Sequence, residues 1–143
     1  MSGPGEPRLA REVLAALLAF GAVSAFAGAV MAIAFDGAGM PPTYLAGSPF
    51  HSFLLPGLIL GVVVGGTQAF AAVALLTGNR WDLVAAAVAG FGMVIWIFVE
   101  LAIIHAYSVL QTLYFGLGLL ELVLVLALLG IGSSTRPARQ DVL

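Results

Sequence analysis

The fold is decided by one long apolar stretch between Phe91 and Gly130, which reads FGMVIWIFVELAIIHAYSVLQTLYFGLGLLELVLVLALLG. Almost every residue in it is hydrophobic, yet it contains two glutamates, Glu100 and Glu121. The stretch is far longer than the ~20 residues that a helix needs to cross the hydrocarbon of a bilayer. It therefore predicts two membrane-spanning helices, with the break between them at residues 106–108.

The composition of the whole chain agrees with a membrane protein. Of its 143 residues, 62% are hydrophobic and 8% are charged, whereas soluble domains carry about 25% charged residues. So little polar surface cannot cover a water-facing exterior, so lipid must be the solvent for most of the chain. The net charge of -2 and the lack of a basic run argue against nucleic acid as a partner. Cysteine is absent, which excludes disulfides and thiolate metal sites.

Two more apolar runs precede this stretch, and together they predict a single all-α membrane domain over residues 1–143. Gly and Pro are dense between residues 36 and 55, and this connection is too long for a simple turn. We expect it to fold on the outer membrane surface, and we expect the tails, about 1–8 and 133–143, to be disordered. The prediction is an antiparallel bundle of four transmembrane helices, with spans at about 13–35, 54–76, 83–106 and 109–131.

The basic residues predict the orientation of the bundle. All five fall on one predicted side of the membrane: Arg8, Arg11, Arg80, Arg136 and Arg139. The positive-inside rule then places both termini in the cytoplasm and the 36–55 loop outside. High Ala and Gly content fits a bacterial source, so the expected location is a bacterial cytoplasmic (plasma) membrane.

The second span contains a row of small residues that indicates close helix packing. Gly57, Gly61 and Gly65 recur every four residues, which places them on one helix face where another backbone can approach. We expect this face to pack on the first or third span within the chain. The alternative is the seam of a homodimer.

Three polar residues are expected near the membrane midplane, judged from their positions within the spans and the rise of 1.5 Å per residue. They are Ser24 in the first span, Gln68 in the second and Glu121 in the fourth. Polar groups in hydrocarbon are costly and face the bundle interior, where they find one another. We therefore expect a hydrogen-bonded cluster of Ser24, Gln68 and Glu121 whose ordinary role is to fix the helix register.

A second polar group is expected toward the outer end of the bundle. The antiparallel third and fourth spans bring Glu100 to a similar depth as Gln111 and Tyr114. The candidate ligand-binding residues are Glu100, His105, Gln111, Tyr114, Trp96 and His51. The alternative is that Glu100 and His105 merely snorkel to the interface and that the aromatic residues form an interfacial belt. Two isolated histidines without a motif do not predict a metal site, and no cofactor is expected.

Several short motifs resemble those of an uncharacterised family of small four-span integral membrane proteins, common in actinobacteria and other bacteria. The similarity covers the chain from Asp36 onward, and the matching residues are Gly47-Ser48-Pro49-Phe50, Leu55-Pro56-Gly57, Trp96-Ile97, Glu100, Ser108, Leu110, Gln111, Tyr114 and Gly118-Leu119-Leu120. This resemblance implies the four-span architecture and no activity. It also implies that the outer loop and the outer halves of the third and fourth spans belong together.

Three functions remain open at this stage. The first is a non-catalytic membrane protein that binds a small hydrophobic or lipid ligand, or that serves as an accessory subunit of a larger membrane complex. The second is a small proton-coupled transporter, which would act as a homodimer because four spans in one chain show no inverted repeat. The third is a lipid isomerase with Glu100 and His105 as acid and base. We rank them in this order, so catalytic residues are not expected.

Overall fold

The computed structural model describes residues 5–104 and 106–134, and within these ranges it contains helices and no strands. Four helices are long and apolar enough to cross a membrane, so the predicted all-α bundle of a multi-pass membrane protein is confirmed. The elements in chain order are α1 (Glu6–Ala34), the 3₁₀ turn η1 (Pro42–Leu45), α2 (Leu54–Ile59), the π-helical segment η2 (Leu60–Gly65), α3 (Gly66–Leu76), α4 (Asp82–Ile103) and α5 (Val109–Ser134).

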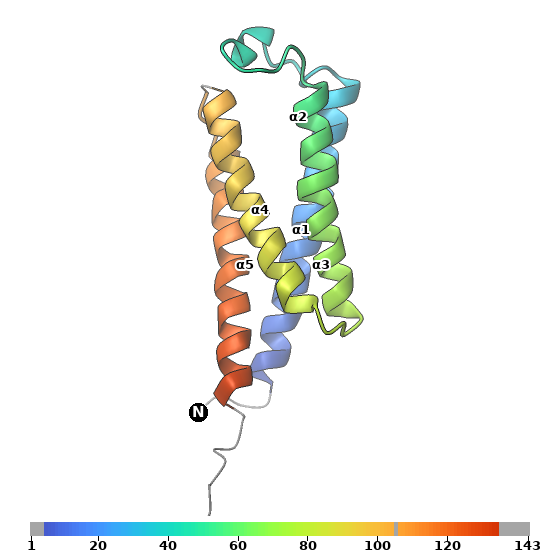
Figure 1. Ribbon diagram of the computed structural model, residues 1–143, viewed down its shortest axis with the longest axis vertical. Helices are drawn as coiled ribbons and strands as arrows, with labels where there is room; N and C mark the ends of the chain where they lie inside the picture. Colours follow the sequence, from blue (N-terminus) through green and yellow to red (C-terminus); the bar gives the residue numbers. More distant parts are fainter. Residues whose placement is uncertain (1–4, 105, 135–143) are drawn as a thin grey trace, which may run out of the picture.

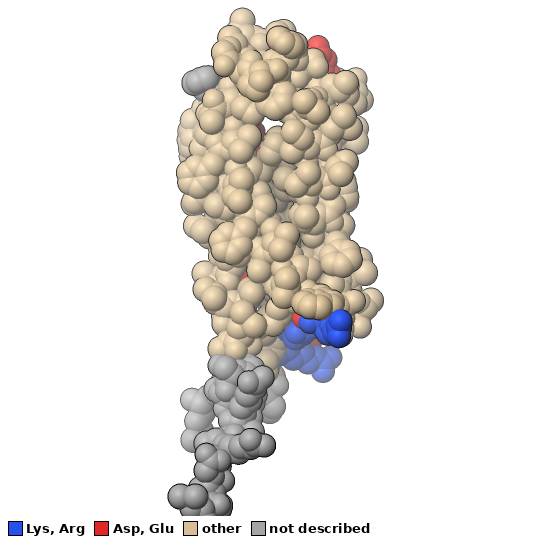
Figure 2. Space-filling view, viewed as in Figure 1, with Lys and Arg blue, Asp and Glu red and all other residues tan. Residues whose placement is uncertain are grey.

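The elements form four antiparallel columns, because α2, η2 and α3 join into one continuous helical column (Figure 1). One end of the bundle, named here the arginine end, carries Arg8, Arg11 and Arg80, which gather as the blue patch in Figure 2. The other end, named here the loop end, is covered by the connection between α1 and α2. The ends differ in charge as the sequence predicted, since no Lys or Arg belongs to the loop-end connections.

The N-terminal boundary differs from the prediction, because residues 6–8, expected in a disordered tail, belong to the start of α1. Pro7 lies in the first turn, where its fixed φ suits helix initiation. Arg8 Nε then donates to Glu12 Oε1 at 3.1 Å, a spacing that supports an exposed helical turn. A polar turn thus extends the helix beyond its apolar stretch. Residues 133–134 are likewise helical, and the tail residues 1–4 and 135–143 lie outside the described part of the chain.

The connection between α1 and α2 is folded rather than extended. Phe53, at its end, is 3% exposed. Its ring lies under Gly37, where a Cβ would come within 2.6 Å of it, and Gly37 has a φ of +83°. Only glycine meets both demands without strain. The loop therefore anchors itself over the end of α2 through Phe53 and stays at the loop end of the bundle.

The glycine row of the second span packs against α1 within the same chain. A Cβ on each glycine would lie within 3 Å of an α1 side chain: 2.8 Å from Ala32 for Gly57, 2.9 Å from Ala29 for Gly61, and 2.7 Å from Phe26 for Gly65. All three glycines are buried. The expected packing face is therefore occupied by α1, and the alternative of a homodimer seam on this row is wrong.

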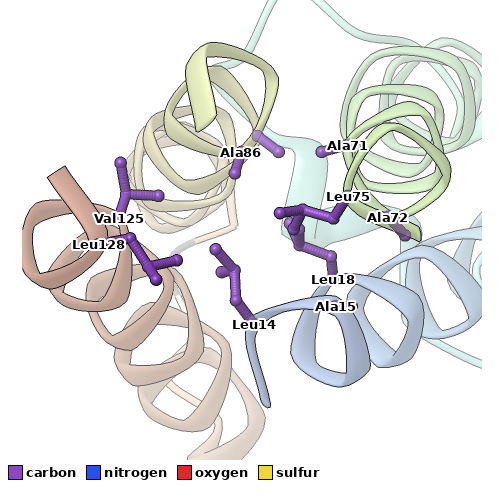
Figure 3. Packing of buried hydrophobic residues seen from close by; sticks show 10 residues of the cluster. Leu14, Ala15, Leu18, Ala71, Ala72, Leu75, Ala86, Val125 and Leu128 are labelled. Carbon is purple, nitrogen blue, oxygen red and sulfur yellow. The ribbon is translucent and has the colours of Figure 1, made fainter. Parts of the chain in front are cut away.

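All four columns meet in the arginine-end half. Leu14 and Leu18 of α1 are fully buried there, and their side chains point into the space between the helices (Figure 3). The core consists of Leu14, Ala15, Leu18, Ala71, Ala72, Leu75, Ala86, Ala89, Val125 and Leu128. An ion pair between Arg11 and the buried carboxylate of Asp82 ties α1 to the start of α4 below this core. Alanines at many of these positions let the backbones approach closely.

The loop-end half is packed differently. Its buried hydrophobic cluster is small and consists of Ala25, Val64 and Met93. α2 packs on α1 but makes no substantial contact with α4 or α5, which pack on each other. Figure 1 shows the α4–α5 pair diverging from the α1–α2 pair toward the loop, and Figure 2 shows the surface hollowed between the pairs. The loop-end half is thus open between two helix pairs.

Candidate functional site

A buried polar layer separates the two halves of the bundle. Gln68 of α3 donates from Nε2 to Glu121 Oε2 of α5 at 2.8 Å and to the carbonyl oxygen of Ala89 in α4 at 3.2 Å. Both Gln68 and Glu121 are fully buried. On α1 this layer lies at Gly21, between Leu18 of the lower core and Ala25 of the upper cluster. One amide therefore links three helices at the level where the close packing ends.

Gly21 makes room for this amide. A Cβ at Gly21 would lie 2.5 Å from Oε1 of Gln68. The orientation of the amide follows from its partners, because the Ala89 carbonyl can only accept and must face the nitrogen. Oε1 of Gln68 and Oε1 of Glu121 consequently have no hydrogen-bond partner within the described structure. Position 21 of α1 must therefore lack a side chain for the polar layer to form.

Ser24 does not join this layer. It is half-buried and makes no hydrogen bond with Gln68 or Glu121 in the described residues. The expected three-residue cluster therefore contains two of its members. The α1 residue that faces the Gln68 amide is Gly21, almost one turn closer to the arginine end, and a glycine offers no polar side chain by which the sequence would reveal it.

The second glutamate lies in the open half. Glu100 is half-buried and follows Met93 and Ile97 on the buried face of α4, at helical spacing. Across the α4–α5 contact its polar neighbour is the side chain of Gln111, which is 5% exposed. The expected juxtaposition of Glu100 and Gln111 is present, and it faces the bundle interior rather than lipid.

Gln111 has a structural role that the sequence interpretation missed. The Ser108 N–H donates to Gln111 Oε1 at 2.9 Å, and the Leu110 N–H donates to Ser108 Oγ at 3.2 Å. This arrangement resembles a capping box at the start of α5, with Ser108 Oγ accepting from the second helical residue in place of the third. Ser108-Val109-Leu110-Gln111 carries the S-x-x-Q pattern, so the signal was present in the sequence. The cap fixes the position of Gln111 beside Glu100 and leaves its amide nitrogen free of the cap.

Two aromatic residues line the same region. Trp96 and Tyr114 are half-buried and pack with Leu117 and Leu60 against the upper cluster. The Tyr114 ring also stacks on Phe20 of α1, with centroids 6.4 Å apart. These two rings therefore belong to the wall of the open half. In the alternative, an interfacial belt, both rings would face lipid, whereas here both are half-buried.

The histidines are not brought to Glu100 by the described structure. His51 is exposed in the loop and makes no hydrogen bond there, while His105 lies outside the described residues. Within the described ranges no three His, Asp or Glu side chains are grouped so that they could hold a metal ion. The polar part of the candidate site is thus Glu100 with Gln111.

The loop-end half thus combines the hollow between the helix pairs (Figure 2), named here the recess, with the polar pair of Glu100 and Gln111. The half-buried side chains of Trp96, Tyr114 and Leu117 supply apolar surface, and the Glu100 carboxyl supplies hydrogen-bond acceptors. Such a combination of many apolar groups with few polar ones is typical of small-molecule sites.

Searches against protein-family models, curated proteins and solved structures gave no match to this chain.

Proposed function

We propose that this chain is a non-catalytic membrane protein that binds a small hydrophobic or lipid ligand at the loop end, between α2 and the α4–α5 pair. One observation carries the proposal. Glu100 lies on the buried face of α4 in the half of the bundle where α2 does not pack against that helix. A carboxyl at membrane depth is costly unless it is well paired or serves a function. Among the described residues, the polar partner of Glu100 is the Gln111 side chain on α5, and α2 supplies none.

The neighbouring residues define the chemistry of the ligand. Gln111 Oε1 already accepts from the Ser108 N–H, so acceptor capacity in the recess comes mainly from Glu100. A ligand head that donates hydrogen bonds, such as a hydroxyl or an ammonium group, complements that carboxyl. The apolar walls formed by Trp96 and Tyr114 complement an acyl or aromatic body. We propose a lipid-like molecule with a donor head.

Ligand binding is preferred to an accessory-subunit role for a structural reason. The subunit role predicts an exposed face of small residues, for which the row Gly57, Gly61 and Gly65 was the candidate. That row is buried against α1. No contact among the described residues favours the transporter or the isomerase over binding, and a homodimer or larger complex remains a proposal without a surface assigned to it.

We also propose that the arginine end faces the cytoplasm of a bacterium, on the basis of the positive-inside rule. The chain has no cysteine, so a single introduced cysteine is the only thiol of the protein that can react with a maleimide. Thr43→Cys should react with a membrane-impermeant maleimide in intact spheroplasts, whereas Asn79→Cys should react only after lysis. The reverse pattern would overturn this orientation.

The ligand proposal is tested by what copurifies with the protein. Chain extracted in a mild detergent is analysed by native mass spectrometry for bound small molecules. Glu100→Gln and Glu100→Leu should lose most of the bound species, because they remove the carboxylate that anchors the donor head. Glu12→Gln is the matched control, since Glu12 is exposed and pairs only with Arg8. Equal retention by Glu100→Leu and Glu12→Gln would contradict the proposal.

A further inference from the structure

An apolar groove runs along the lipid-facing side of α4, away from the Glu100 recess. Its volume is about 510 Å³, and its walls carry no polar surface. They include Val84, Val88, Phe91 and Ile95 of α4 with Val125 and Leu129 of α5. Between Leu83 and Ile95, the α4 residues at its two ends, the helix rises about 18 Å. One leaflet of the hydrocarbon is about 15 Å thick, so the groove has the length of a single acyl chain.

A second groove of about 320 Å³ lies on the other side of the same helix. Val62, Gly66 and Phe70 of the neighbouring column line it together with Ala85 and Val88 of α4. Val88 belongs to both grooves and forms the ridge between them. Two apolar channels that straddle one ridge suit the two chains of a diacyl lipid.

Both grooves lie just beyond a cation at the arginine end. Arg80 and Trp81 immediately precede α4, and the Arg80 guanidinium lies over the Trp81 ring, 5.0 Å from its centroid. The ion pairs in the described residues join Arg8 to Glu12 and Arg11 to Asp82. Arg80 makes none there, so its charge is available. Trp and Arg are residues that membrane proteins place at the level of lipid headgroups.

We propose that an anionic phospholipid binds here, with its phosphate at Arg80 beside Trp81 and one acyl chain in each groove astride Val88. The charge of Arg80 complements an anionic headgroup, and the apolar grooves complement the chains. This site is independent of the ligand proposed at Glu100, because it lies at the opposite end and on the outer surface. A second copy of the chain is a poorer occupant, since parallel copies meeting along α4 would bring their Arg80 charges together at one level.

The test uses the full chain in detergent with an equal mixture of phosphatidylglycerol and phosphatidylcholine that have identical chains. Native mass spectrometry then measures the ratio of the two bound lipids. The natural chain should prefer phosphatidylglycerol by about fivefold, the equivalent of about 1 kcal/mol for one basic side chain at the membrane surface. Arg80→Gln should bring the ratio near one, whereas Arg80→Lys and the control Arg8→Gln should keep it.

The grooves are tested separately by filling them. A Cβ at Gly92 would meet only the Thr67 hydroxyl, at 3.9 Å, so Gly92→Leu should fill groove space without disturbing the fold. Gly116→Leu is the matched control, because a Cβ at Gly116 meets nothing within 4 Å and Gly116 lines neither groove. Gly92→Leu should lose retained lipid of both kinds, and Gly116→Leu should not.

Three results would overturn the proposal. The first is equal retention of the two lipids by the natural chain, and the second is an unchanged preference in Arg80→Gln. The third is equal lipid retention by Gly92→Leu and Gly116→Leu. If Arg80→Gln fails to fold, the lipid preference of the natural chain and the comparison of Gly92→Leu with Gly116→Leu still decide, because both are measured with Arg80 in place.

Discussion

The arginine-end half and the loop-end half of the bundle are built from the same four columns, yet they pack in different ways. In the arginine-end half, alanines and leucines from α1, α3, α4 and α5 form one continuous core. In the loop-end half, the columns separate into the pairs α1–α2 and α4–α5, with a small cluster between them. The polar layer of Gln68 and Glu121 marks the level of this change.

Side-chain size explains the difference. Gly57 of α2 and Gly61 of η2 let this column approach α1, because they place no side chains between the two backbones. Across the wider gap, the large rings of Trp96 on α4 and Tyr114 on α5 reach the cluster that contains Ala25 and Val64. Because α2 packs closely on α1, it does not cover the inner face of the α4–α5 pair. A polar residue such as Glu100 can occupy that uncovered face.

The largest effect on stability is expected in the arginine-end core. Leu18 is fully buried, and Leu18→Ala should lower the free energy of unfolding by at least about 2 kcal/mol through the cavity it leaves. Leu117→Ala, in the half-buried wall of the loop-end half, should cost less than half as much. Unfolding in mixed micelles with increasing dodecyl sulfate measures both. Equal losses would show that the two halves are packed alike.

In the polar layer, substitutions of Gln68 and Glu121 should have non-additive effects on the free energy of unfolding. Gln68→Leu leaves the Glu121 carboxyl buried without a partner, and Glu121→Leu leaves the Gln68 amide with the Ala89 carbonyl alone. Each loss should cost about 1–3 kcal/mol. The double variant should cost less than the sum, with a coupling of about 0.6–1.7 kcal/mol, the range found for hydrogen bonds between membrane helices. A double-mutant cycle in the same micelle assay measures this coupling. Strict additivity would mean that the two side chains act separately.

The ion pair below the core should contribute less. Arg11 is about one-third exposed while Asp82 is mostly buried, so Arg11→Gln should cost about 1 kcal/mol or less. Arg8→Gln, which breaks an exposed pair on one helix turn, should cost less still. The micelle assay at low and high salt separates them, because only the exposed pair is strongly screened. A larger loss for Arg8→Gln would contradict the assignment of Arg11 as the link to α4.

The smallest stability effect is expected at the candidate ligand site. Glu100 has an open recess beside it and a single polar neighbour, Gln111. Glu100→Leu should change the free energy of unfolding by about 0.5 kcal/mol or less, the usual range for sites away from close packing. Melting curves of the delipidated protein measure this change. A loss comparable to that of Leu18→Ala would instead make Glu100 a structural residue.

The architecture could be predicted from the sequence because apolar length and helix spacing determine it. Four spans, the packing role of the Gly57 row and the contact of Gln68 with Glu121 all follow from depth and period. The opening of the loop-end half could not be predicted. It depends on whether the glycine row packs on the first span or on the third, and the sequence left both possible. The role of Gly21 was also missed. Gly21 provides space for the Gln68 amide, and a glycine has no side chain by which the sequence would indicate such a role. The helical start at Glu6 was missed because polar turns carry no hydropathy signal.

If the recess beside Glu100 is open to a ligand, the fluorescence of Trp96 should report the binding directly. The chain has two tryptophans, and Trp81 lies at the far end, so Trp81→Phe leaves Trp96 as the sole indole. A short-chain alcohol brominated along its tail should quench Trp96 emission in a saturable manner, and Glu100→Leu should weaken that binding at least about tenfold, or about 1.4 kcal/mol. Quenching that rises linearly with concentration and ignores Glu100→Leu would contradict the claim.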